Sequence, residues 1–147
     1  MENLKLHVGY DKKEALYVRE SLINYNKKQV AYTEEEKINI IIKDENHNIL
    51  GGILGNIDWK CFHIEILWID DVLRGQGQGR ELMKEAEKVA IEKGCNLIRL
   101  ETYSFQAPDF YKKLGYEVLG KLENYPEGFD HYYLFKRIKK KKNKKKK

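Results

Sequence analysis

The sequence predicts a single mixed α/β domain of the α+β type, with helices against a mostly antiparallel sheet of about six to seven strands. Its 147 residues suit one domain, because two would each have too small a core. Hydrophobic residues make up 41% and charged residues 35%, as in ordinary globular proteins. Strand-like and helix-like patterns follow one another in an order that requires both parallel and antiparallel pairing. We expect this domain to span residues 1–138.

Alternation and β-branching predict four strands in the N-terminal half. They lie at residues 4–8, 37–43, 49–57 and 60–70. Apolar residues at helical spacing predict a helix over 12–30, and Thr33 with Glu36 resembles a capping box that would begin another helical turn. The last three strands are close in sequence and so are expected to pair as an antiparallel meander.

A glycine-rich segment, residues 73–79, divides the long third strand of that meander from the second half of the chain. The pattern then predicts two helices, at 80–93 and 107–115, and three strands, at 96–103, 116–122 and 130–138. The strand–helix–strand unit from residue 60 to residue 103 requires its two strands to be parallel.

The net charge of +5 is concentrated at the C-terminus. Ten of the 28 basic residues and no acidic residue lie within 136–147, which leaves 18 basic against 23 acidic side chains before them. The folded part is therefore acidic, which favours a cationic partner. Because a lysine run cannot bury apolar area, we expect residues 139–147 to form a disordered tail without a specific nucleic-acid partner.

Several classes of protein are excluded by composition. No apolar run reaches the roughly 18 residues of a membrane helix, and the N-terminus has no signal-peptide core. Cys61 and Cys95 lack the spacing of a disulfide framework or a zinc module. We therefore expect a cytoplasmic protein, monomer or homodimer, with no metal and no membrane partner.

The glycine-rich loop carries the clearest functional signal. Residues 74–79 read Arg-Gly-Gln-Gly-Gln-Gly between a strand and a helix, where backbone amides can approach and bind a phosphate. A Walker A loop is excluded, because Arg80 and Glu81 stand where Lys and Ser or Thr are needed. A dinucleotide fingerprint does not fit either, because the glycines are spaced GxGxG and too many strands come first.

The loop matches the pattern R/Q-x-x-G-x-G/A as Arg74-x-x-Gly77-x-Gly79, and here the sequence resembles the GCN5-related N-acetyltransferase (GNAT) superfamily. Further family motifs occur in order, as Leu67-Trp68-Ile69, Gly79-x-x-Leu82 and Ala107-x-x-x-Tyr111-x-Lys113-x-Gly115-Tyr116. The resemblance covers about residues 49–122. One departure is Ser104, which stands where the family often has a cofactor-contacting asparagine.

The resemblance implies acetyl-CoA as the acetyl donor and direct attack by a primary amine in a ternary complex. The residues that it implies for donor binding are Leu67, Trp68, Ile69, Arg74, Gly75, Gln76, Gly77, Gln78, Gly79, Arg80, Ser104, Gln106 and Ala107. Tyr111 stands where the family's tyrosine protonates or hydrogen-bonds the leaving sulfur.

A base must also remove a proton from the ammonium before it attacks. His63 and Glu65 are two residues apart on one strand and are expected to share a face, where the family commonly has its base. Both alternatives stay open, since a histidine exchanges protons near neutral pH and a carboxylate attracts an ammonium.

The acceptor is less defined by the sequence. Acidic and polar or aromatic candidates for its pocket are Tyr25, Asn26, Tyr32, Trp59, Glu101, Tyr125 and Asp130. Such a pocket would favour a small cationic amine. The alternative function is a non-catalytic module on the same scaffold that binds acyl-CoA or interacts with nucleic acid.

Overall fold

The structure is a computed structural model that describes residues 3–31 and 33–139, so the predicted tail lies almost entirely outside the described residues. The chain divides into two compact units, with the boundary in the sequence between Thr33 and Glu34. The first contains α1 (Lys12–Lys27), and the second contains the sheet and the remaining helices. No helix in the described ranges has the length and apolar character that crossing a membrane requires.

The first unit is built around α1, which begins and ends at clear caps. The Asp11 side chain accepts a hydrogen bond from the Glu14 N–H, and the Lys28 N–H closes the last turn. The predicted helix is confirmed but stops at Lys27. The predicted strand at residues 4–8 is wrong, because those residues join none of the described ladders and five alternating residues cannot hold a strand without a partner.

The second unit is a six-stranded sheet. Its strands are β1 (Glu36–Lys43), β2 (Ile49–Asp58), β3 (Cys61–Ile69), β4 (Leu97–Tyr103), β5 (Glu117–Glu123) and β6 (Asp130–Arg137). They lie in the order β1-β2-β3-β4-β6-β5, with β3 and β4 parallel and every other pair antiparallel. The predicted fold class and the parallel unit are therefore confirmed.

The capping-box prediction at Thr33 and Glu36 is wrong. Glu36 begins β1 and pairs with Ile57 of β2 instead of beginning a helical turn. The β-branched residues that follow it, Ile38, Ile40 and Ile42, pack against the core, so tertiary packing outweighs the local capping pattern.

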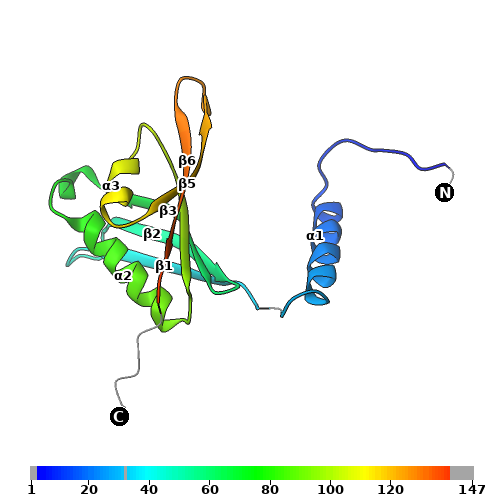
Figure 1. Ribbon diagram of the computed structural model, residues 1–147, viewed down its shortest axis with the longest axis horizontal. Coiled ribbons are helices and arrows are strands. Elements are labelled where there is room, and N and C mark those ends of the chain that lie inside the picture. The colour runs from blue at the N-terminus through cyan, green and yellow to red at the C-terminus, as the bar shows by residue number, and fades with distance from the viewer. Residues whose placement is uncertain (1–2, 32, 140–147) are drawn as a thin grey trace, which may run out of the picture. The chain divides into compact units, whose positions relative to one another are not determined.

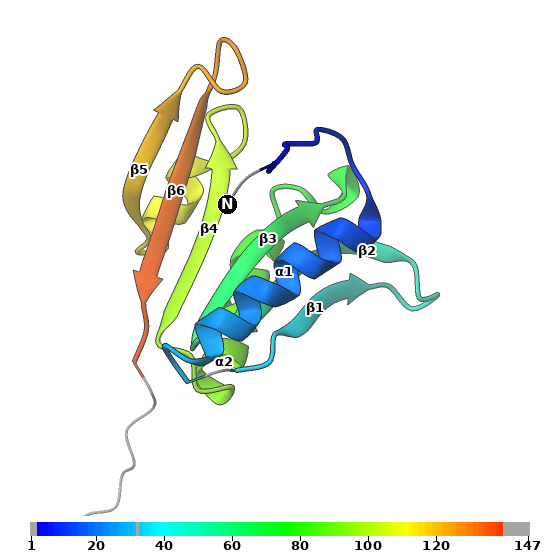
Figure 2. The same cartoon turned by 90° about the vertical axis from the view of Figure 1, so that its right-hand side faces the viewer.

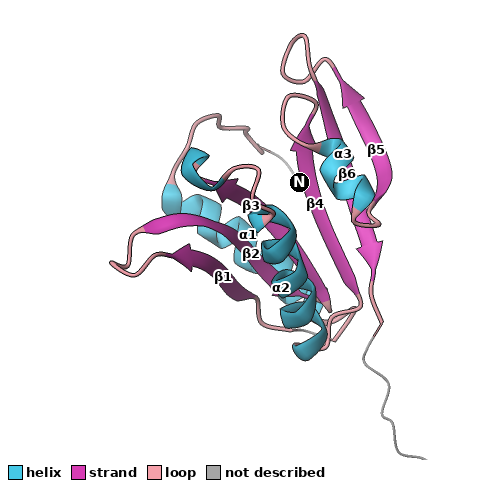
Figure 3. Cartoon of the chain, turned by 90° about the vertical axis from the view of Figure 1, so that its left-hand side faces the viewer, coloured by secondary structure: helices cyan, strands magenta, loops and turns pink. Residues whose placement is uncertain are grey.

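Two helices cover one face of the sheet, α2 (Gln78–Glu92) and α3 (Pro108–Lys113), and a short 3-10 turn, η1 (Asp71–Leu73), precedes α2. Figures 1 and 3 show α2 over the β1–β3 half and α3 over the β4–β6 half. The residues of α2 that face the sheet recur at helical spacing and are Leu82, Met83, Ala86 and Ala90. They pack against Phe62, Ile64, Ile98 and Leu100 to form the core.

Both cysteines are free and buried. Burial raises the pKa of the Cys61 thiol and of the Cys95 thiol. Neither cysteine is therefore suited to act as a thiolate nucleophile.

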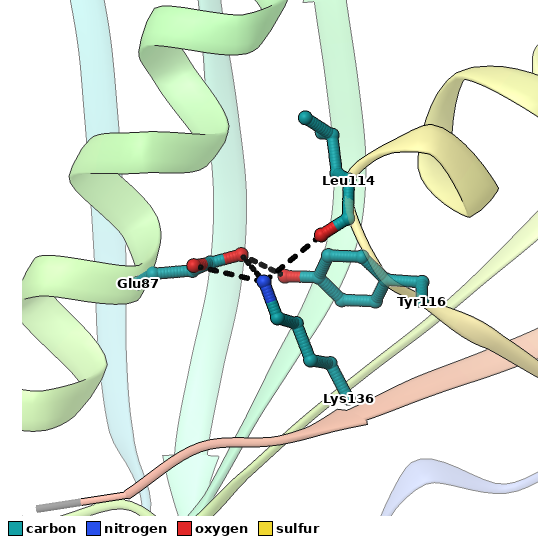
Figure 4. Close-up of polar contacts among 4 residues, drawn as sticks. All are labelled: Glu87, Leu114, Tyr116 and Lys136. Atoms are coloured by element: carbon teal, nitrogen blue, oxygen red, sulfur yellow. Dashed lines mark hydrogen bonds and ion pairs between the residues drawn. The ribbon is translucent and has the colours of Figure 1, made fainter.

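A polar cluster joins α2, the end of α3 and β6 (Figure 4). The Lys136 Nζ donates to both Glu87 carboxylate oxygens, at 3.3 and 3.1 Å, and to the Leu114 carbonyl at 2.9 Å. The Tyr116 hydroxyl donates to Glu87 Oε2 at 3.0 Å. Burial, followed by the Glu87 charge, raises the pKa of Tyr116, so this hydroxyl stays a donor. The cluster fixes the chain where α3 turns into β5.

We expect Lys136→Met to lower the free energy of unfolding by about 1–2 kcal/mol, because it leaves the Glu87 carboxylate and the Leu114 carbonyl without their cationic partner. Chemical denaturation measures this loss. Lys121→Met is the matched control, since Lys121 forms an exposed pair with Glu123 at 3.6 Å and should change stability by less than about 0.5 kcal/mol. Equal losses in the two variants would contradict a structural role for the cluster.

Candidate active site

The ladder between β3 and β4 is short, and this creates an opening in the sheet. Cys61–Ile64 pair with Leu97–Leu100, and the described strands share no pairs beyond that point. Figure 2 shows β3 and β4 diverging from there. On its other side β3 stays paired with β2 as far as Ile69. The β4-facing backbone of residues 65–69 is therefore available to an extended ligand, which could pair as an added strand.

A cavity of about 820 Å³ lies where the two strands separate. Its lining comes from the end of β3, the glycine-rich loop, the turn after β4 and α3. Because residues alternate between faces along a strand, the opening also connects the helix-covered face, with Tyr111, to the opposite face, with Glu101. A ligand in the cavity can therefore contact groups from both faces of the sheet.

The loop end of the cavity is shaped to receive an anion. Gly77 is the N-cap of α2, and its φ of +79° is a left-handed conformation that favours glycine. The helix therefore begins at Gln78, two residues earlier than predicted. A Cβ on Gly79 would lie 3.2 Å from the Phe110 ring, so a glycine there lets α2 pack closely. The N–H groups of the α2 N-terminus point to this end, and Arg74 and Arg80 belong to the same lining, with Arg74 Nε paired to Asp71 Oδ1 at 3.0 Å.

Two carboxylates line the cavity at the strand opening. Glu65 has no partner in the β2–β3 ladder, because the register shifts there, and its Oε2 accepts a hydrogen bond from Asn56 Nδ2 at 2.8 Å. Glu101 lies across on β4, with its Oε1 3.4 Å from His63 Nε2. His63 itself does not line the cavity. Of the two predicted base candidates, only Glu65 lines the cavity. His63 contacts Glu101, which lines it.

Tyr111 reaches the cavity from α3. Tyr111 is only 7% exposed, and its ring forms T-shaped pairs with the rings of Phe110 and Tyr116. Burial raises the pKa of Tyr111 to about 12, so its phenol stays protonated at physiological pH and can donate a hydrogen bond.

The structure brings most of the predicted site residues together around this cavity. Those that line it are Glu65, Leu67, Trp68, Ile69, Arg74, Gly75, Gly77, Gln78, Gly79, Arg80, Gln106, Ala107 and Tyr111. Three do not: His63, Gln76, whose side chain donates to the Val72 carbonyl, and Ser104, whose hydroxyl accepts from the Asp130 N–H. The functional roles of all these residues stay predictions.

The cavity is also lined by residues that no sequence motif assigned to donor binding or to catalysis. They are Ile66, Leu73, Glu101, Thr102, Phe105 and Phe110, of which Glu101 was an acceptor candidate. Of the other acceptor candidates, Trp59, Tyr125 and Asp130 belong to the second unit and do not line the cavity. Tyr25 and Asn26 lie on α1 in the first unit, and Tyr32 lies outside the described residues. Within residues 3–31 and 33–139, no three His, Cys, Asp or Glu side chains gather into a metal site.

Comparison with known proteins identifies the fold and the family. The family model for the acetyltransferase (GNAT) family matches residues 9–116. Blasticidin-S acetyltransferase from Streptomyces morookaense is 37% identical over 95 residues, which cover 64% of this chain and 70% of that protein. An acetyltransferase crystal structure from Bacillus cereus is 36% identical, with a TM-score of 0.86 and coverage of 91% of this chain and 98% of that chain.

The chain belongs to the GNAT family of acetyltransferases, as the sequence motifs predicted. It is an acetyl-CoA-dependent N-acetyltransferase. A related fold from Bacillus anthracis, 24% identical with a TM-score of 0.61 over 70% of this chain and 63% of that one, was solved in complex with acetyl coenzyme A. Acetyl coenzyme A has an anionic pyrophosphate and an extended pantetheine arm. The loop end of the cavity suits the first, and the unpaired β3 backbone of residues 65–69 suits the second.

Proposed function

We propose that the protein acetylates a small cationic primary amine, which attacks the donor directly in a ternary complex. The charge distribution in the cavity carries the proposal: arginines at the α2 end suit a pyrophosphate, and Glu65 and Glu101 at the strand opening suit an ammonium. Related enzymes support an amine acceptor by their names, which include thialysine N-epsilon-acetyltransferase from Bos taurus and peptidyl-lysine N-acetyltransferase from Escherichia coli.

In this proposal the α2 end holds the donor. The amides after Gly77, with Arg74 and Arg80, bind the pyrophosphate, and the free edge of Leu67–Ile69 hydrogen-bonds the pantetheine. Gln76 and Ser104 serve indirectly, because their hydrogen bonds hold the loop and the turn after β4 in place. Acetyl-CoA supplies an acetyl thioester, whose carbonyl carbon is the electrophile.

The remaining groups manage the protons. Glu101, held by His63, binds the ammonium, and Glu65 accepts one of its protons directly or through water. The freed amine bonds to the acetyl carbon as the carbon–sulfur bond breaks, and Tyr111 donates a hydrogen bond or a proton to the sulfur. Of the two protons that the ammonium loses, one ends on the thiol and the other leaves to solvent.

We expect Gly77→Val to weaken CoA binding by at least about tenfold, because a β-branched residue is strained at a positive φ and would displace the amides of the α2 N-terminus. Calorimetry with CoA measures this. Gly77→Asn is the matched control, since asparagine tolerates the left-handed conformation and should retain most of the affinity. Undiminished binding in the valine variant would remove the loop from the donor site.

The acceptor class is tested with a panel of amines, acetyl-CoA and an assay for thiol release. Small amines that carry a net positive charge should be acetylated, and neutral amines, amino acids and peptide N-termini should react much more slowly, because only the cations are attracted by both carboxylates. Turnover confined to neutral or acidic amines or to peptide N-termini would overturn the proposed acceptor.

A further inference from the structure

An aromatic cluster lies next to the strand opening of the cavity, where Glu65 and Glu101 are found. Its members come from the end of β4, the turn after it, the connection between β5 and β6, and the start of β6: Tyr103, Phe105, Tyr125, Phe129 and His131. Tyr103 stacks on Phe105, with ring centroids 5.4 Å apart and planes at 8°, and on His131 at 4.4 Å. The Phe129 and Phe105 rings form a T-shaped pair, with their centroids 5.0 Å apart. The rings are thus fixed by one another.

Phe105 connects this cluster to the cavity. It lines the cavity and is 54% exposed, although Tyr103 stacks on its ring. Phe129 and Tyr125 are similarly exposed, at 45% and 51%. Preorganised aromatic rings that stay half-open to solvent next to a ligand cavity provide a surface on which another ring can stack without any loss of side-chain freedom.

The surroundings of Phe105 indicate that the acceptor, and not the donor, stacks on its ring. Glu101, which also lines the cavity, is only two residues before the stacked Tyr103 on β4, so a cationic group and a ring can be held together there. The adenine end of the donor carries phosphates, whose cationic partners Arg74 and Arg80 belong to a different segment.

We infer that the preferred acceptor is a primary amine with a planar aromatic ring, which stacks on Phe105 while the ammonium pairs with Glu101. This inference rests on the proposed function and narrows its acceptor class. It predicts that aromaticity, and not size or apolar area alone, decides between amines of equal charge.

The test compares 2-phenylethylamine with 2-cyclohexylethylamine, which have the same charge and a similar shape. The wild-type protein should favour the aromatic amine by about two- to tenfold in kcat/KM. Phe105→Leu should abolish this preference and leave the Kd for CoA unchanged. Leu119→Ala, at a β5 position that is 72% exposed and outside the cavity lining, should retain the preference.

The Kd of each amine for the CoA-bound protein, from calorimetry, separates failure of this inference from failure of the proposed function. Selective binding of the aromatic amine without turnover would support the stacking site and contradict the proposed acetylation of small amines. Equal kcat/KM and equal Kd values for the two amines in the wild-type protein would overturn the stacking site, even if both amines are acetylated. A weaker Kd for CoA in Phe105→Leu overturns it too, because the ring would then contact the donor.

Discussion

Tyr111→Phe should lower kcat by about ten- to a thousandfold and leave the affinity for CoA nearly unchanged. The substitution keeps the ring that packs against Phe110 and Tyr116 and removes only the hydroxyl. If that hydroxyl stabilises the departing sulfur, its loss affects the transition state and not the binding of the donor. Steady-state kinetics with a saturating amine, together with CoA calorimetry, measure the two quantities.

The chain contains a matched control for this experiment. Tyr116 is also buried, but it does not line the cavity and its hydroxyl donates to Glu87. Tyr116→Phe should therefore lower stability and leave kcat close to that of the wild type. If the two variants lose activity equally, the effect is structural and Tyr111 has no part in the chemistry.

The pH dependence gives a second check on Tyr111. Because burial raises its pKa from 10.0 to about 12, the phenol stays protonated as the pH rises to about 10. The wild-type rate should therefore not fall on this account over the range in which more of the amine becomes free. A loss of rate between pH 8 and 10 that disappears in Tyr111→Phe would contradict this assignment.

Most of the second unit could be predicted from sequence because local patterns and tertiary packing agree there. The β-branched residues of β1 and the small and apolar residues of α2 at helical spacing each identify an element and its buried face. Where a pattern was short, as at residues 4–8, or competed with strand pairing, as at Glu36, the prediction failed. A local sequence pattern is sufficient to predict a helix or a strand only when tertiary packing and strand pairing favour the same structure.

The site was harder to predict, because its geometry depends on register between distant strands. The spacing of His63 and Glu65 placed them on one face, but the register shift at Leu54 and Gly55 leaves Glu65 unpaired at the cavity. The proximity of His63 to Glu101 depends on the parallel pairing of β3 with β4, which spacing along the chain cannot reveal. Phe105 had no motif, since its importance comes from the rings that surround it.

The two carboxylates should separate by their kinetic effects. Glu65→Gln should lower kcat about a hundredfold near neutral pH, because an amide cannot accept the ammonium proton. The glutamine side chain can still accept the Asn56 hydrogen bond, so the fold should be retained. Glu101→Gln should mainly raise the KM for the amine, by about tenfold, because it removes the charge that holds the ammonium.

The pH profile decides which residue is the base. High pH supplies free amine without catalysis, so raising the pH should partly restore Glu65→Gln, whereas Glu101→Gln should remain defective in KM until the amine itself loses its charge. His63→Asn should act through Glu101 and raise the KM for the amine by less than Glu101→Gln does. If His63→Asn instead lowers kcat at neutral pH and recovers at high pH while Glu65→Gln keeps the wild-type rate, histidine is the base. If every variant keeps the wild-type rate at all pH values, the enzyme only holds an already neutral amine next to the thioester.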